Sequence, residues 1–175
     1  MSAVSSGASR GTGTRHGTRL EGVQSAPGTT LPSTPFGRET IESILPHRAP
    51  FLLLDEVVEL EPGRRVVARF EVRPDAWWFP GHFPSRPVMP GVLIVESMAQ
   101  TGAVAVLVEP ANRGKIAFFA GIDDCRFKRV VEPGDTLTLT CEIDQLRGPI
   151  GRGKATAHVD GQLATRGTLT FAVER

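Results

Sequence analysis

The chain has 175 residues, of which 40% are hydrophobic, and this is enough for one domain with a buried core. Its formal net charge is only +1, so the overall charge gives no reason to expect nucleic-acid binding. The longest apolar runs, at 92–95 and 103–108, are far shorter than the roughly 20 residues that cross a bilayer, which argues against a membrane protein.

The two cysteines, Cys125 and Cys141, have neither metal-ligand spacing nor a disulfide framework around them. Their scarcity fits a reducing compartment, and we expect a cytoplasmic protein without a bound metal.

The first 35 residues are rich in Ser, Thr, Gly and Pro and contain no continuous apolar stretch. Such a segment has too little hydrophobic mass to compensate for the entropy of ordering, so residues 1–35 are predicted to be a disordered tail and residues 36–175 the folded domain. Its arginines and serines, with a single acidic residue, are also typical of an organelle transit peptide, although its glycines argue against the amphipathic helix of such peptides.

The domain is predicted to begin with a short helix that Thr40 caps and Pro46 ends. Residues 51–74 then resemble two strands joined at Glu61-Pro62-Gly63. Further strands are expected at 115–131, 135–146, 153–160 and 162–174, where hydrophobic residues alternate and turn residues intervene.

One long helix is predicted at 90–108, with prolines at both ends. Apolar side chains surround most of its circumference, which is typical of a buried helix. An antiparallel sheet can bury such a helix only by curling around it, so the expected fold class is α+β with a sheet wrapped around one central helix.

Two polar residues stand out against this apolar background. Glu96 lies in the second turn of the buried helix, where an ionised carboxylate is costly without a partner, and Gln100 follows one turn later to orient it. His82 lies in a loop stiffened by several prolines, which restricts the positions open to its imidazole. Each residue taken alone also fits a purely structural role.

The segments "LPHRAPFLLLD", "GHFPSRPVMPGVLIVESMAQ", "FAGIDDCRFKRVVEPGD" and "VDGQLA" together give the chain a family resemblance. In order and without a large insertion, from about residue 39 to 173, the sequence resembles the 3-hydroxyacyl-[acyl-carrier-protein] dehydratases of type II fatty acid synthesis, the FabZ kind. The resemblance implies a hot-dog fold and a homodimer whose two sheets join into one, with three dimers often assembling further.

The resemblance also implies that His82 and Glu96 are the catalytic residues and that they meet across the dimer interface. The substrate would be a 3-hydroxyacyl chain on the phosphopantetheine arm of acyl carrier protein, in fatty acid or polyketide synthesis, with no cofactor. Histidine is suited to remove the C2 proton, while a glutamate in an apolar tunnel can have its pKa raised enough to be protonated, or can hold a water, and so help hydroxide to leave.

Other residues receive more specific expectations. Gly91, at the start of the helix, is expected to polarise the thioester carbonyl through an unsatisfied N–H. His47, in the matched segment, is expected to make a structural hydrogen bond only. The expected tunnel-lining residues are Phe83, Val92 and Phe118, and those expected to dock the carrier protein are Arg126, Lys128 and Arg129.

Two alternative functions remain open at this point. A hot-dog thioesterase would use an acid on the central helix to activate water, although such enzymes do not usually carry the GHF loop. A non-catalytic acyl-binding subunit would keep the fold, but both reactive residues are retained here.

Overall fold

The structure is a computed structural model that describes residues 31–175, so the predicted tail at 1–35 lies almost wholly outside the described residues. Within these residues, two helices and seven strands follow one another. They are β1 (Phe36–Gly37), α1 (Arg38–Ile44), β2 (Glu56–Glu61), β3 (Arg65–Glu71), α2 (Gly91–Leu107), β4 (Ala117–Phe127), β5 (Thr136–Arg147), β6 (Ile150–Val159) and β7 (Gln162–Val173).

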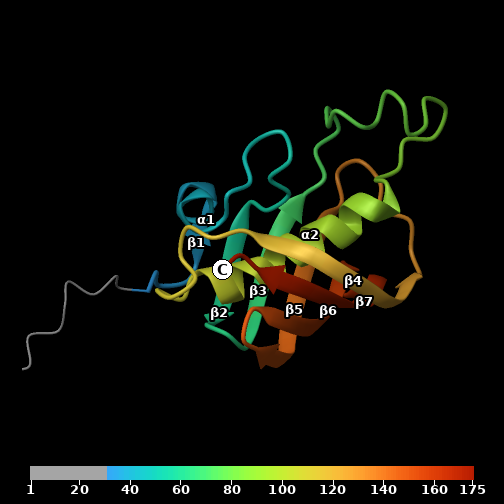
Figure 1. Ribbon diagram of the computed structural model, residues 1–175. Coiled ribbons are helices and arrows are strands. Elements are labelled where there is room, and N and C mark those ends of the chain that lie inside the picture. The colour runs from blue at the N-terminus through green and yellow to red at the C-terminus, as the bar shows by residue number, and fades with distance from the viewer. Residues whose placement is uncertain (1–30) are drawn as a thin grey trace, which may run out of the picture.

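The seven strands form one antiparallel sheet in the order β1-β2-β3-β5-β6-β7-β4. The sheet curves around α2, which contacts β3, β4, β5, β6 and β7 (Figure 1). This arrangement confirms the predicted hot-dog fold, with one helix enclosed by an antiparallel sheet. None of the helices in residues 31–175 is long and apolar enough to cross a membrane.

The strands follow the hydrophobic alternation read from the sequence. In β5, Leu137, Leu139 and Cys141 are buried, while Thr136 and Thr138 face outward and are exposed. The predicted hairpin of β2 and β3 is also confirmed. Its turn needs Gly63, which has a φ of +69° and donates its N–H to the carbonyl of Ala105 in α2 at 2.8 Å.

Two local predictions near the start of the domain are wrong. Thr40 does not cap α1, because the helix already begins at Arg38 with Gly37 as its N-cap residue. The segment 51–54 is not a strand, although Leu52, Leu53 and Leu54 are buried. Its backbone bonds to the side chain of Gln100 in α2 rather than to a neighbouring strand.

The helix α2 is buried on almost every side, as its composition predicts. One stripe of the helix is less buried than the rest: Val92 is 73% exposed, and Glu96 and Ala99 are half-buried. These residues are spaced four and three apart, so they lie on one face of the helix. The single glutamate of the helix therefore lies on its least buried face.

We predict that Leu139→Ala lowers the free energy of unfolding by about 2–5 kcal/mol, because it leaves a cavity between β5 and α2. Thr138→Ala, one position along on the exposed face of the same strand, is the matched control and should cost less than about 0.5 kcal/mol. Chemical denaturation of both variants measures the difference, and equal losses would contradict the packing of β5 on α2.

Candidate active site

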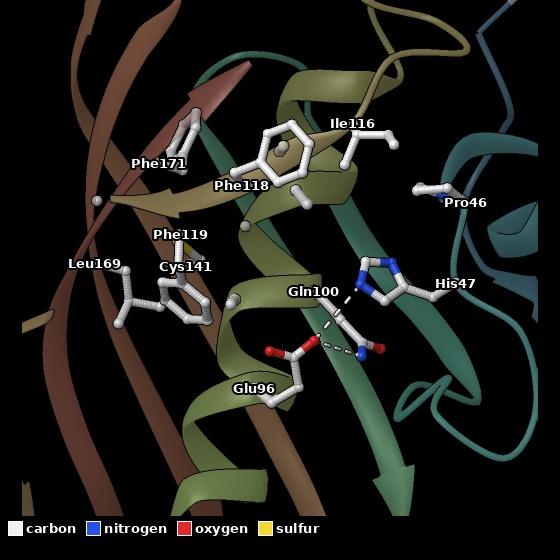
Figure 2. Close-up of a pocket in the computed structure, with 15 residues that line it drawn as sticks. Pro46, His47, Glu96, Gln100, Ile116, Phe118, Phe119, Cys141, Leu169 and Phe171 are labelled. Carbon is white, nitrogen blue, oxygen red and sulfur yellow. Dashed lines mark hydrogen bonds and ion pairs between the residues drawn. The ribbon is translucent and has the colours of Figure 1, made fainter. Parts of the chain in front are cut away.

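The carboxylate of Glu96 lies in a cavity of about 330 Å³ between α2 and the sheet, here called the glutamate cavity (Figure 2). One end is polar and is formed by His47, Glu96 and Gln100. The rest is apolar, with walls from β4, β5 and β7 that include Phe118, Cys141, Leu169 and Phe171. An apolar pocket with a few convergent polar groups at one end is suited to bind a ligand with a hydrocarbon chain and a polar reacting group.

Gln100 fixes the position of Glu96 and ties it to the segment 51–54. Its side-chain Nε2 donates to Glu96 Oε1 at 2.9 Å and to the Phe51 carbonyl at 2.8 Å, and its Oε1 accepts from the Leu53 N–H at 2.8 Å. The predicted hydrogen bond between Gln100 and Glu96 is therefore present. Gln100 is only 1% exposed, and its three hydrogen bonds fix the orientation of the amide. One N–H of the amide therefore always points toward Glu96.

The contact of His47 with Glu96 is what sequence reasoning missed. The Nε2 atom of His47 lies 3.5 Å from Glu96 Oε1, and both side chains are largely buried. No sequence pattern links the two residues, since His47 lies in the loop after α1 and only the folding of the chain brings it to α2. Its presence in a segment matched to the family was the one signal that could have drawn attention to it.

The surroundings of Glu96 lower its pKa. Burial by itself raises the pKa of this carboxyl, but hydrogen bonds from His47 and Gln100, together with the charge of His47, bring it below the ordinary value of 4.5. The expectation of a raised pKa is thus wrong for the single chain, because it considered burial without His47. Since the pKa is lower in the folded state than in the unfolded state, Glu96 stabilises the fold at neutral pH, and this contribution is lost as the pH falls through the folded pKa.

The thiol at the apolar end of the cavity is unreactive. Burial raises the pKa of Cys141 to about 12, so the thiol stays protonated at neutral pH. The other cysteine, Cys125, is free and half-buried on β4.

His82 lies in a second hollow, here called the histidine groove, of about 540 Å³. The groove is formed by the loop before α2, the first turn of α2 and residues 127–131, and it shares no lining residue with the glutamate cavity. Within one chain, His82 and Glu96 therefore face different hollows.

The loop holds the imidazole of His82 in a defined tautomer. Its Nδ1 lies 2.9 Å from the Val88 carbonyl, which can only accept a hydrogen bond, so Nδ1 carries the proton. In the neutral ring, Nε2 then has a free lone pair. The Val88 N–H in turn donates to the His82 carbonyl at 3.0 Å, so the loop closes on itself around the ring. A histidine held in this way is arranged to act as a base through Nε2.

The first turn of α2 supplies the groove with free N–H groups. Leu93 and Ile94 are the first residues to donate within the helix, both to the Pro90 carbonyl, so the N–H groups of Gly91 and Val92 have no partner inside it. A Cβ at Gly91 would lie 2.8 Å from the ring of Phe127, so glycine allows this ring to pack against the helix start.

The three expected lining residues lie in different places. Phe118 lines the glutamate cavity and Val92 lines the histidine groove. Phe83 lines neither hollow, and its ring stacks on His82 with 4.1 Å between ring centroids while remaining 52% exposed. Phe83 thus contacts the imidazole itself.

The three basic residues lie at the end of β4 and just beyond it. Lys128 and Arg129 line the histidine groove, whereas Arg126 is exposed outside it. Arg129 is partly compensated by Asp135, whose carboxylate lies 3.4 Å away. Among the residues that the structure describes, no three His, Cys, Asp or Glu side chains are grouped to hold a metal ion.

A curved antiparallel sheet around one helix, with a histidine loop before the helix and a glutamate within it, defines a hot-dog protein with a candidate acid–base site. The solved dehydratase heterocomplex ApeI:P of Xenorhabdus doucetiae has the same fold, with a TM-score of 0.67 and 20% identity over 77% of this chain and 91% of that one. A model of the FabA-like domain family matches residues 45–168.

Curated relatives define the family more narrowly. The 3-hydroxyacyl-[acyl-carrier-protein] dehydratases FabZ of Staphylococcus carnosus and Staphylococcus aureus are each 60% identical to this chain over 141 residues, which cover 81% of this chain and 97% of theirs. The chain therefore belongs to the FabZ dehydratases within the FabA-like family.

We predict that Gln100→Leu destabilises the protein by about 1–3 kcal/mol, because the buried Leu53 N–H and Phe51 carbonyl lose their partner. The same change removes a donor from Glu96 and should raise the pKa of that carboxyl. Thermal unfolding and a carbon-13 carboxyl titration measure the two effects. Gln145→Leu, at an exposed position of β5, is the control and should leave both unchanged; a Gln100→Leu variant that matched it would contradict the hydrogen-bond network.

Proposed function

We propose that this protein dehydrates 3-hydroxyacyl-acyl-carrier-protein to the trans-2-enoyl thioester in fatty acid synthesis. The observation that carries the proposal is the 60% identity to FabZ dehydratases over 97% of their length, together with His82 and Glu96 in the two hollows beside α2. Neither a thioesterase nor a non-catalytic subunit is favoured by these relatives. A polyketide substrate remains compatible with the same chemistry.

We propose further that the working unit is a homodimer in which His82 of one chain faces the partner subunit's Glu96. The edge strand β4 supports this arrangement. All of its residues are exposed or half-buried, and Phe118, Ile122 and Phe127 are each more than half exposed. An unpaired edge with this much apolar surface is a surface that a second chain can cover. Joining two such edges would unite the two sheets, and further assembly into three dimers stays a prediction.

In this dimer His82 is the base. Its Nε2 removes the C2 proton of the substrate, and the electron pair moves toward the thioester carbonyl to give an enolate. The free N–H groups of Gly91 and Val92, at the positive end of the α2 dipole, are suited to stabilise the developing negative charge on that oxygen. The imidazolium formed on His82 then returns the proton as the C3–O bond breaks, so that the hydroxyl leaves as water.

Glu96 acts as an ionised carboxylate in this scheme. Because its pKa is lowered, it accepts a hydrogen bond from the 3-hydroxyl of the substrate or from a bound water, and so aligns the leaving group. The acyl chain would extend into the apolar part of the glutamate cavity, past Phe118. Phe83, packed on the imidazole of His82, would help to line the approach to the reacting carbons.

The expected partner is an acidic carrier protein. Arg126, Lys128 and Arg129 would give it a basic surface to bind beside the histidine groove. The phosphopantetheine arm would enter there. We propose a cytoplasmic location, because both cysteines are free thiols, as expected in a reducing compartment.

The purified protein should convert 3-hydroxyacyl carrier protein into a product lighter by one water, measured by mass spectrometry. Release of the acyl group would indicate a thioesterase instead, and binding without a mass change would indicate a non-catalytic subunit.

His82→Ala and Glu96→Gln should each reduce the rate of water loss by about 10²- to 10⁴-fold, the usual contribution of a positioned acid–base group. Glu142→Gln, on the exposed part of β5, is the matched control and should keep the wild-type rate. Wild-type turnover in both site variants would refute the assignment.

A further inference from the structure

Glu96 is held at one of its two oxygens only. Both Gln100 Nε2, at 2.9 Å, and His47 Nε2, at 3.5 Å, face Oε1. Within residues 31–175 no hydrogen bond or ion pair involves Oε2. Figure 2 shows this second oxygen pointing away from His47, toward the side of the cavity where Phe119 and Leu169 lie. The carboxylate thus has a clamped oxygen and an oxygen open to the cavity.

The imidazole of His47 has no other polar contact in the described part of the chain. Its Nδ1 is buried without a hydrogen-bond partner, whereas the corresponding atom of His82 is bonded to a carbonyl. A histidine that served to stabilise its own loop would use this atom for a backbone bond. The loop is instead stabilised by Arg48, whose Nη1 donates to the carbonyls of Leu45 and His47 at 2.9 and 2.7 Å. The ring is therefore placed for its contact with Glu96.

We propose that His47 is a positioning residue for the dehydration: together with Gln100 it clamps Oε1 of Glu96, so that Oε2 is the oxygen presented to the 3-hydroxyl of the substrate. This inference rests on the proposed function. It goes beyond the expectation that His47 makes only a structural hydrogen bond, because the residue that it contacts is Glu96. His47 itself touches no reacting atom and acts through the carboxylate.

The clamp differs from Gln100 alone in its charge. A neutral amide can orient a carboxylate, whereas an imidazole can also attract its negative charge, and the charge of His47 is one of the causes that lower the pKa of Glu96. The charged and titratable groups facing Glu96 from the elements around it are few. The loop after α1 contributes His47, β5 contributes the protonated thiol of Cys141, and the cavity residues of β4, β6 and β7 are uncharged. Within the described part of one chain, His47 is therefore the one basic group that lines the cavity beside the carboxylate. In the proposed dimer the partner subunit's His82 would face the carboxylate as well.

The test compares His47→Ala and His47→Gln with wild type, with His158→Gln on β6, outside both hollows, as the control. A misplaced carboxylate reduces the stabilisation of the transition state more than it reduces substrate binding. His47→Ala should therefore lower kcat by about 10- to 100-fold and change KM less than about threefold. His47→Gln, which keeps a donor near the same place, should recover part of kcat. His158→Gln should match wild type.

A second measurement does not depend on turnover. Loss of His47 removes interactions that lower the pKa of Glu96, so this pKa should rise in His47→Ala. Carbon-13 carboxyl titration, with the resonance assigned through Glu96→Gln, reads this directly in the folded protein. The acid limb of the kcat profile should move to higher pH in the same variant, because the required carboxylate is then protonated earlier as the pH falls.

An active wild type whose kcat, pH profile and Glu96 titration are all unchanged by His47→Ala would overturn the inference and leave the proposed function intact. Equal loss of kcat in His47→Ala and His47→Gln with an unchanged titration would also overturn it, since it would indicate a purely structural role. An inactive wild type would instead contradict the proposed function, whatever the titration shows.

Discussion

The enclosure of α2 is the constraint on which the rest of the structure depends. The helix is apolar on nearly all sides, so the chain must surround it. The curved sheet, together with α1 and the segment 51–54, leaves only the stripe through Val92, Glu96 and Ala99 partly uncovered. Every strand from β3 to β7 contacts the helix, so the need to bury α2 determines where these strands lie. The uncovered stripe is also where the two hollows open, so the site arises where the enclosure is incomplete.

A carboxylate on such a helix needs compensation, and the chain provides it from a distant segment. The irregular backbone at 51–54 does not pair with a strand and forms hydrogen bonds with the side chain of Gln100 instead. Gln100 in turn orients Glu96 through a further hydrogen bond. His47, just before this segment, faces the same oxygen. The loop after α1 thus belongs to the site as much as α2 does. Its hydrogen bonds explain why a buried carboxyl keeps a lowered pKa and stays ionised.

The fold could be predicted well from the sequence because its signals are local. The strands β5 to β7 alternate with period two, the helix is apolar all round, and turn residues such as Gly63 mark the connections. The clamp on Glu96 could not be predicted in the same way, because His47 and Glu96 are distant in sequence and no periodicity links them. Local patterns also misplaced the cap of α1, where Thr40 matched a common capping residue but lies inside the helix.

The central claim is that each active site combines His82 of one chain with the partner subunit's Glu96. Two heterodimers test this claim, each purified through a different tag on each chain and each carrying one His82→Ala and one Glu96→Gln substitution in total. One pairs His82→Ala with Glu96→Gln, and the other pairs a chain carrying both substitutions with a wild-type chain. Our account predicts about half of wild-type turnover in the first, which keeps one intact site of two, and none in the second. Activity in the second heterodimer and none in the first would contradict it.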